Sequence, residues 1–347
     1  GGFGMKSIVC HGPKDIRIEE RPSPVADTKQ VLIRVNSGGI CGSDLHYYNN
    51  GGFGEIRLRE PMILGHEISG HITALGEGVA GLSVGDLVAV NPSRPCNDCE
   101  FCREAMYNQC LNMRYYGSAM RFPHIQGAFS EQLVVDDSQC VRVAEGVTPQ
   151  QAAFAEPLAV ALAAVNKLGN LKGKHLLVTG TGPIGALVVA VAKVHNPLEV
   201  VATDRIDTAL EYARAAGADK TINVASEASA LDEYRTGKGR FDAVVEASGS
   251  EQALRTALNV LRPRGTLVLL GLGGEVTLPL NELVAKEIQV RGNFRFHQEF
   301  FSAVELIGEQ RLPLEPLLTG VFPLDDAAAA FETANDRQQS MKVQLQF

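Results

Sequence analysis

The sequence predicts an α/β fold in which a doubly wound parallel sheet accompanies a second, β-rich region. Up to about residue 155, short apolar runs are separated by glycine pairs and prolines, as in a loop-rich β domain. From about residue 158, strand patterns alternate with helix patterns, and a glycine-rich turn joins the first such strand to its helix. Strands that alternate with helices build βαβ units, which place the strands in one parallel sheet.

The individual elements follow from these patterns. In the first part, apolar runs bounded by turn residues predict strands over 31–35, 87–90 and 132–135. In the second part, strands are expected over 175–180, 200–204, 241–248 and 265–270. Apolar positions at helical spacing predict helices over 183–195, 208–216 and 251–261. Near its end the chain is expected to form a helix over 325–334 and an alternating strand over 342–347.

Length and composition describe a globular protein of about two domains. The chain has 347 residues, of which 45% are hydrophobic and 21% are charged. A formal net charge of −8 argues against nucleic acid or an anionic membrane as a partner. No apolar run reaches the length of a membrane span, and no signal-peptide pattern precedes Met5. We therefore expect a cytoplasmic protein.

Four of the seven cysteines form the pattern C-x2-C-x2-C-x7-C at Cys96, Cys99, Cys102 and Cys110. Four thiolates this close can complete a tetrahedral shell, which suits a structural zinc ion. An iron–sulfur cluster is the alternative, but no proline follows the last cysteine and the sequence has no second cluster. Disulfides fit poorly with a large chain that shows no export signal. A closed four-cysteine site leaves no position for a substrate, so we expect it to hold structure.

A G-x-G-x-x-G turn lies between the first strand and the first helix of the second part. It reads Gly180-Thr181-Gly182-Pro183-Ile184-Gly185. Its glycines let the backbone approach a diphosphate at the positive N-terminus of the helix. A proline suits the first helical turn because its missing N–H would be unpaired there. The turn therefore predicts a Rossmann domain that binds a dinucleotide.

Asp204 follows Gly185 by 19 positions, at the end of the next predicted strand. A carboxylate there can bind the ribose hydroxyls and repel a 2′-phosphate, which favours NAD over NADP. Arg205 complicates this prediction, because a neighbouring guanidinium could accommodate that phosphate. We expect NAD as the cofactor, with NADP as the alternative.

A second set of metal-ligand types is spread along the chain. Cys41 lies in a Cys-Gly-Ser-Asp-Leu-His run, His66 and Glu67 lie in Gly-His-Glu, and Glu156 lies in Glu-Pro-Leu-Ala. Taken singly, a buried thiol and a core histidine are ordinary features. Together the side chains offer a mixed sulfur, nitrogen and oxygen set, and catalytic zinc keeps about three protein ligands and one open position.

The order of these motifs resembles the zinc-containing medium-chain dehydrogenases over essentially the whole chain from Met5. The C-G-S-D-x-H run, G-H-E, the four-cysteine segment, E-P-L-A and the glycine turn follow one another as in that family. E-P-L-A with glutamate is typical of its sorbitol and polyol dehydrogenase branch. The segments 114–124 and 292–296 further resemble L-idonate 5-dehydrogenases.

The resemblance implies a discontinuous architecture. A GroES-like, zinc-binding catalytic domain is expected over 5–157 and 296–347, and the Rossmann domain over 158–295. The family also implies a homodimer or a homotetramer.

Two groups of catalytic residues are implied by the resemblance, the ligands of a catalytic zinc ion and a proton relay. The ligands are Cys41, His66 and either Glu67 or Glu156. The relay is Ser43 and His46, which would pass the substrate's hydroxyl proton to solvent while a hydride goes to the nicotinamide. With the four-cysteine site this makes two zinc ions per chain. These intact residues oppose the alternative of a non-catalytic binding protein.

Substrate residues are carried over from the same resemblance. The positions that match the polyol pocket are Tyr47, Glu156, Arg295 and Phe296, and Asn293 and Phe294 are expected beside the cofactor. A sugar acid needs a cation for its carboxylate, and the candidates are Arg121, His124 and Arg295. We therefore expect the NAD-dependent oxidation of a secondary hydroxyl of a sugar acid, L-idonate to 5-keto-D-gluconate. The alternative is a sorbitol or xylitol dehydrogenase that recognises no carboxylate.

Overall fold

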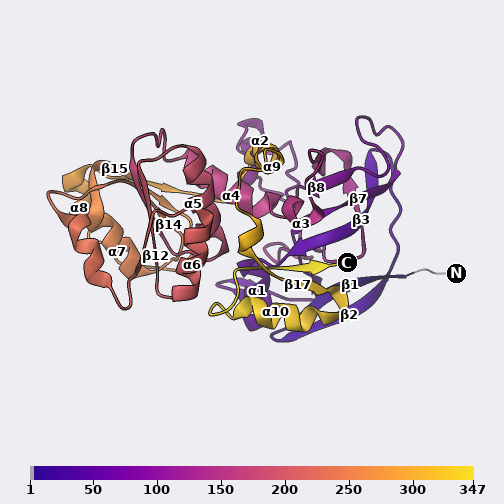
Figure 1. Cartoon of the computed structure of the whole chain (residues 1–347). Helices are drawn as coiled ribbons and strands as arrows, with labels where there is room; N and C mark the ends of the chain where they lie inside the picture. Colours follow the sequence, from indigo (N-terminus) through magenta and orange to yellow (C-terminus); the bar gives the residue numbers. More distant parts are fainter. Residues whose placement is uncertain (1–3) are drawn as a thin grey trace.

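The computed structural model describes residues 4–347, which form a parallel α/β body and a β-rich body side by side (Figure 1). The parallel sheet has six strands in the order β13-β12-β11-β14-β15-β16. These are β11 (His175–Thr179), β12 (Glu199–Asp204), β13 (Lys220–Asn223), β14 (Phe241–Glu246), β15 (Leu261–Leu269) and β16 (Gln289–Gly292). Its helices are α5 (Pro183–Val194), α6 (Asp207–Ala216), α7 (Glu251–Val260) and α8 (Leu280–Lys286), with the 3-10 segment η3 (Ala228–Arg235) before β14.

Both faces of this sheet are buried, because its strands divide their side chains between two apolar clusters. Leu176 and Val178 of β11 pack with residues of α5 and α6, whereas Leu177 packs with residues of α7. Figure 1 accordingly shows α5 and α6 on one face of the sheet and α7 and α8 on the other. Alternate residues of a strand point to opposite faces of the sheet, and helices cover both of these faces. The predicted α/β class with a doubly wound sheet is confirmed.

The β-rich body contains a seven-stranded sheet in the order β10-β8-β7-β3-β18-β17, with β9 paired to β3. Its strands are β3 (Gln30–Gly39), β7 (Glu67–Leu75), β8 (Leu87–Val90), β9 (Gln132–Asp136), β10 (Cys140–Arg142), β17 (Leu318–Pro323) and β18 (Lys342–Gln346). A second sheet joins β1 (Gly4–Gly12), β2 (Asp15–Pro22) and β6 (Met62–Ile63), and β4 (Gly52–Phe53) pairs with β5 (Ile56–Arg57). The last strand of the chain therefore lies against β3, near its beginning.

Helices and turns complete the β-rich body and its junction with the parallel sheet. They are α1 (Gly42–Asn50), α2 (Glu100–Arg103), η1 (Tyr107–Gln109), η2 (Asp137–Gln139), α3 (Pro149–Ala152), α4 (Ala155–Asn166), α9 (Glu299–Gly308), η4 (Glu315–Leu317), η5 (Leu324–Asp326) and α10 (Ala327–Asn335). The buried residues of α4 belong to the same apolar cluster as those of α5 and α9. In the described part of the chain, no helix is long and apolar enough to cross a membrane.

Two helices beside the candidate site were not predicted, and one predicted strand of the parallel sheet has a different start. The Cys-Gly-Ser-Asp-Leu-His run, for which no helix was predicted, forms the N-cap and first part of α1, and Gly51 caps the end of this helix in the left-handed region with a φ of 71°. The helix α4 has apolar residues on all sides, so its sequence carries no amphipathic pattern. The strand expected from residue 265 begins at Leu261 and contains a register shift against β14.

Candidate active site

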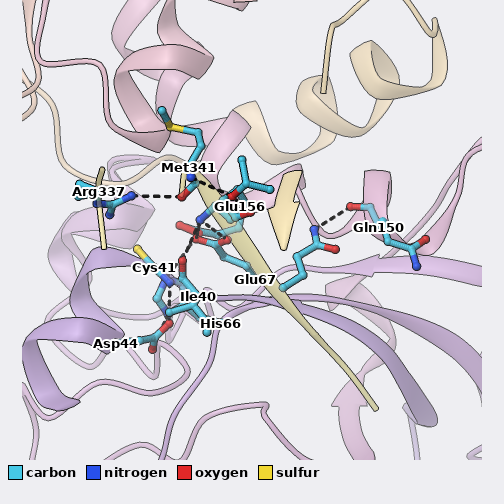
Figure 2. Close-up of polar contacts among 12 residues, drawn as sticks. Ile40, Cys41, Asp44, His66, Glu67, Gln150, Glu156, Arg337 and Met341 are labelled. Carbon is cyan, nitrogen blue, oxygen red and sulfur yellow. Dashed lines mark hydrogen bonds and ion pairs between the residues drawn. The ribbon is translucent and has the colours of Figure 1, made fainter. Parts of the chain in front are cut away.

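Four potential metal ligands converge where α1, β7, α4 and β18 meet (Figure 2). Cys41 caps the N-terminus of α1, Glu67 is the first residue of β7, and the ligand atoms of Cys41, His66 and Glu67 all lie within 4.8 Å of one another. Glu156 comes from the first turn of α4, and its Oε2 atom lies 3.6 Å from Nε2 of His66. The structure thus brings together side chains that are up to 115 positions apart in the sequence.

Glu156 has a carboxylate oxygen that lacks a hydrogen-bond donor. Its Oε1 atom accepts a hydrogen bond of 3.0 Å from the hydroxyl of Tyr115, whereas the buried Oε2 atom has no partner. Burial raises the pKa of Glu156 to about 8, against the opposing effect of His66. A buried, unpaired carboxylate oxygen is unfavourable, and a cation bound between Glu156 and His66 would satisfy it. This side chain fits the role of a metal ligand.

Glu67 is already paired. Both of its carboxylate oxygens accept hydrogen bonds from Nζ of Lys342, at 2.8 and 3.1 Å, and Lys342 also donates to the carbonyl of Ile40. Burial lowers the pKa of Lys342, but the charge and hydrogen bond of Glu67, together with Cys41 and Glu156, outweigh it and the net shift is upward. Lys342 was not among the sequence candidates, because a lysine in the last strand gives no sign of which carboxylate it meets.

Asp44 supports the histidine from its other side. One of its carboxylate oxygens accepts the backbone N–H of Cys41 at 2.9 Å, and the other lies 3.8 Å from Nδ1 of His66 without a hydrogen-bond partner. Asp44 is fully buried, and burial raises its pKa. A carboxylate beside the second ring nitrogen orients a metal-binding histidine. Asp44 is a second residue that the sequence predictions missed, although it lies inside the Cys41 motif.

The thiol of Cys41 is protonated in the absence of a metal. Burial raises its pKa to about 11, and the charge of Glu67 adds to the effect. A metal ion would bind the thiolate and release this proton. The chemistry of the donor set, one sulfur, one nitrogen and one free carboxylate oxygen, suits zinc with one position left open.

The predicted relay residues lie on α1. Ser43 and His46 are three positions apart, so they share one side of the helix. Ser43 is partly buried, and the exposed ring of His46 lies 5.4 Å from that of Phe53. The two side chains thus lead from a partly buried position at Ser43 to the solvent at His46. Their role in proton transfer remains a prediction.

Arg295 is a second cation near this group, after Lys342. Its guanidinium stacks on Tyr115 at 3.8 Å and donates a weak contact of 3.7 Å to the sulfur of Met120. Burial lowers its pKa, while Tyr115, Glu156, Tyr47 and Cys41 act in the opposite direction. No acidic side chain within residues 4–347 forms an ion pair with it.

Buried aromatic rings complete the surroundings of Arg295. Phe296 is buried, and its ring lies 6.3 Å from that of Tyr115. Tyr47 is also buried, and its hydroxyl accepts the backbone N–H of Ala119 at 2.9 Å. Tyr115 was not a sequence candidate, although it lies in the segment 114–124 that contributed to the resemblance.

The other two candidates for carboxylate binding are engaged elsewhere. Nε2 of His124 accepts the backbone N–H of Arg59 at 2.9 Å, and Nδ1 donates to the carbonyl of Arg121 at 2.7 Å. The exposed Arg121 donates to the carbonyls of Asn112 and Met113. Both side chains are occupied by backbone groups, and of the three candidates only Arg295 stacks on Tyr115.

The glycine turn between β11 and α5 has the geometry that a dinucleotide requires. Gly180 has a φ of 82°, and a Cβ atom there would lie 2.7 Å from the backbone nitrogen of Ser248. A Cβ on Gly185 would overlap the carbonyl oxygen of Gly180. Gly182 caps α5, Pro183 opens it, and Ile184 follows. The backbone is therefore free to approach a diphosphate at the start of this helix.

Asp204 closes β12 beside this turn. Its Oδ2 atom accepts the backbone N–H of Thr181 at 2.8 Å, and Oδ1 accepts those of Arg205 and Ile206 at 2.7 and 3.0 Å. The side chain of Arg205 is exposed. Asp204 thus holds the glycine turn against the end of β12 and keeps oxygen lone pairs for ribose hydroxyls.

Asn293 and Phe294 follow β16. The Oδ1 atom of Asn293 accepts a hydrogen bond of 2.6 Å from Nζ of Lys167, and Phe294 is 42% exposed.

Arg337 is a further cation that the sequence predictions missed. It donates to the carbonyl of Met341 at 3.1 Å (Figure 2), and it is close enough to interact electrostatically with Asp204 and with a Cys41 thiolate.

The four cysteines of the second metal group lie together on and around α2. All four sulfurs are within 4.8 Å of one another. Backbone N–H groups point at them, from Cys99 to Cys96 and from Cys96 to Cys110, both at 3.2 Å. The N–H donors of Asp98 and Cys99 lower the pKa of Cys96 to about 6. Sulfurs that accept amide hydrogen bonds are suited to the thiolate form, which a closed tetrahedral metal site needs.

Comparison with known proteins agrees with this arrangement. The alcohol dehydrogenase GroES-like domain family matches residues 27–145, and the zinc-binding dehydrogenase family matches residues 183–309. The chain is 39% identical to the L-idonate 5-dehydrogenase (NAD(P)(+)) of Escherichia coli over 99% of its own length and 98% of that protein. The crystal structure of that enzyme matches with a TM-score of 0.95, covering 100% of this chain and 99% of the other.

A second relative comes from the polyol dehydrogenases. The sorbitol dehydrogenase of Gallus gallus is 35% identical over 98% of this chain and 95% of its own length. The predicted GroES-like and Rossmann folds are thereby confirmed. The chain belongs to the zinc-containing medium-chain alcohol and polyol dehydrogenase family, and it is an NAD(P)-dependent oxidoreductase that acts on a CH–OH group.

Proposed function

We propose that this enzyme oxidises a secondary hydroxyl of a sugar acid, with L-idonate as the substrate and 5-keto-D-gluconate as the product. The observation that carries the proposal is the guanidinium of Arg295, which is partly buried, has no acidic partner in the described chain and stacks on Tyr115. A desolvated, unpaired guanidinium is a strong binding site for a carboxylate. The name of the Escherichia coli relative supports the same substrate.

We further propose that Cys41, His66 and Glu156 hold the catalytic zinc ion, and that Cys96, Cys99, Cys102 and Cys110 hold a structural one. Glu156 is preferred over Glu67 because its Oε2 atom has no hydrogen-bond partner and faces His66, whereas Lys342 occupies both oxygens of Glu67. Three ligands leave one position open. When bound there, zinc supplies the Lewis acidity that lowers the pKa of the substrate hydroxyl.

The remaining steps belong to the protein and the cofactor. The substrate's hydroxyl proton passes to Ser43 and then to the exposed His46, which returns it to solvent. Bound NAD would supply the acceptor for the hydride that leaves with the electron pair of the C–H bond at the same carbon, while the C=O bond forms there. With the cofactor bound, Asn293 and Phe294 would lie beside the nicotinamide, and the turn at Gly180–Gly185 would hold the diphosphate.

NAD is the proposed cofactor, because Asp204 at the end of β12 would repel a 2′-phosphate. The exposed Arg205 keeps NADP as the weaker alternative, and the relative's name includes both cofactors.

A homodimer or homotetramer is the proposed assembly. The exposed apolar side chains of Leu280 and Val284 on α8, and of Val290 on the outermost strand β16, support it. Reduced thiolates in the four-cysteine site fit the cytoplasm.

Arg295→Ala tests the substrate. It is expected to lower kcat/KM for L-idonate by about a hundredfold, because a charge-assisted hydrogen bond is worth roughly 1.5–3 kcal/mol. The kcat/KM for sorbitol should change by less than about fivefold, since sorbitol carries no carboxylate. Steady-state NADH production with L-idonate, D-gluconate, sorbitol and xylitol measures both values.

The matched control is Arg121→Ala, which removes an exposed guanidinium that contacts only backbone carbonyls. This variant should behave like the parent enzyme. A parent enzyme that prefers sorbitol or xylitol, or an Arg295→Ala variant with unchanged idonate turnover, would show that the alternative polyol dehydrogenase is correct.

The number of protons released on zinc binding tests Glu156 as a ligand. Its pKa of about 8 means that the metal-free protein holds this proton at pH 7 and loses it as the pH rises. For the same reason, the contribution of Glu156 to metal-free stability is complete below its unfolded pKa of about 4.3 and is lost as the pH rises through 8. At pH 7 the parent protein should therefore release about one proton more than Glu156→Gln.

Titration calorimetry in buffers of different ionisation enthalpy, with excess zinc, measures this difference. By pH 9 the difference should shrink to about one tenth of a proton, because Glu156 is then ionised before the metal arrives. Equal proton release by the two proteins at pH 7 would remove Glu156 from the ligand set.

A further inference from the structure

The loop over residues 293–297 carries Arg295 in an unusual backbone conformation. Arg295 has a φ of 52°, in the left-handed region that non-glycine residues seldom adopt. Such a conformation costs energy and persists only where the surroundings hold it. The contacts on either side of Arg295 therefore decide where its guanidinium lies.

Two of these contacts come from the segment between Cys96 and Cys110, which we call the four-cysteine lobe. Asn108 donates a hydrogen bond of 2.8 Å from Nδ2 to the carbonyl of Phe294, the residue before Arg295. The ring of Tyr107 stacks on His297, two residues after Arg295, with 4.1 Å between ring centroids and 29° between planes. Both side chains belong to η1, which lies between Cys102 and Cys110.

The opposite side of the loop is held from the end of α4. Lys167 binds the side chain of Asn293, whose Nδ2 atom lies 3.4 Å from the carbonyl of Arg295. The guanidinium itself rests on the ring of Tyr115. Without the lobe, the chain from Phe294 to His297 would lose its contacts on one side, and the left-handed conformation of Arg295 would lose that support.

We propose that Tyr107 and Asn108 are positioning residues for Arg295, so that the metal-held lobe sets the orientation of the guanidinium that receives the substrate's carboxylate. This inference rests on the proposed role of Arg295. It gives the four-cysteine site a part in substrate recognition, although none of its sulfurs contacts a substrate. Its signature is a change in substrate affinity with no change in the metal content or in the hydride step.

Asn108→Leu removes the donor with little change of size, and Tyr107→Ala removes the stacked ring. Each is expected to raise KM for L-idonate about fivefold, as for one lost hydrogen bond or ring contact. The values of kcat, KM for sorbitol, Kd for NADH and zinc content should stay at the parent level. Tyr107→Phe keeps the ring and should restore the parent KM, and Gln109→Leu on the same turn serves as the exposed control.

A double-variant cycle separates this inference from the proposed function. Asn108→Leu should add nothing to KM once Arg295→Ala is present, because its effect passes through Arg295. If Arg295→Ala raises KM for L-idonate but neither lobe variant does, the positioning role is wrong and the proposed function stands. If Arg295→Ala has no effect, the proposed function fails. Loss of zinc, or an equal rise of KM for sorbitol, would show that the lobe acts only as a structural support and would overturn the inference.

Discussion

Replacing Cys41 with serine is expected to lower kcat/KM by at least about a thousandfold. The thiolate is the one sulfur ligand among the proposed catalytic zinc ligands, and a serine hydroxyl does not ionise at neutral pH to take its place. Loss of the metal removes several kcal/mol of transition-state stabilisation, and each 1.36 kcal/mol corresponds to about a tenfold change in rate. Zinc analysis of the purified variant should show that only the four-cysteine site is still filled.

The matched control is Cys140→Ser, which changes a half-buried thiol outside both metal-ligand groups. Burial raises the pKa of Cys140 to about 12, so this thiol stays protonated. The control should keep its metal content and its kcat/KM. A Cys41→Ser protein that retains full zinc content and activity would remove Cys41 from the site.

Replacing Lys342 with methionine is expected to lower the free energy of unfolding by about 3 to 5 kcal/mol. The substitution keeps the length of the side chain and leaves Glu67 buried and without its partner, and an uncompensated buried charge costs roughly this much. Lys342 and Glu67 are 3% and 1% exposed in their side chains, so water cannot replace the lost ion pair. Urea unfolding of the zinc-loaded protein at pH 7 measures the loss.

Two further variants make this result specific. Lys342→Met combined with Glu67→Gln removes both charges and should recover a large part of the lost stability. Lys193→Met breaks the exposed pair with Asp219 and should cost less than about 1 kcal/mol. If Lys342→Met costs no more than Lys193→Met, then Lys342 does not neutralise Glu67, and the preference for Glu156 as the ligand loses its basis.

The features that could be predicted from sequence are those that a short stretch of chain determines. Alternating strand and helix patterns specify the parallel sheet, since hydrophobic periodicity is a local property. The glycine turn lies between β11 and α5, as its sequence pattern predicts. Its positions require glycine because β-carbons at Gly180 and Gly185 would overlap neighbouring backbone. The four sulfurs meet within a single lobe, over a span of 15 residues from Cys96 to Cys110.

Among the helices that the sequence patterns did not predict, α1 and α4 each have a physical reason. The helix α1 has no apolar stripe, and it is held by the carboxylate of Asp44 on the N–H of Cys41 and by Gly51 at its C-terminus. The helix α4 is buried on nearly all sides between α5 and α9, so an amphipathic pattern is absent. Both helices place candidate ligands, Cys41 and Glu156.

The sequence by itself determined the family, the kinds of ligand and the cofactor fold, because these depend on residue types at fixed spacing. Only the tertiary structure decided which of the two carboxylates, Glu67 or Glu156, has an oxygen without a hydrogen-bond partner. Lys342 reaches Glu67 across 275 positions because β18 returns to pair with β3 beside β7. Glu156 keeps an unpaired oxygen toward His66 because α4 buries it there. Such pairings depend on strand order and burial over the whole chain, which no local pattern encodes.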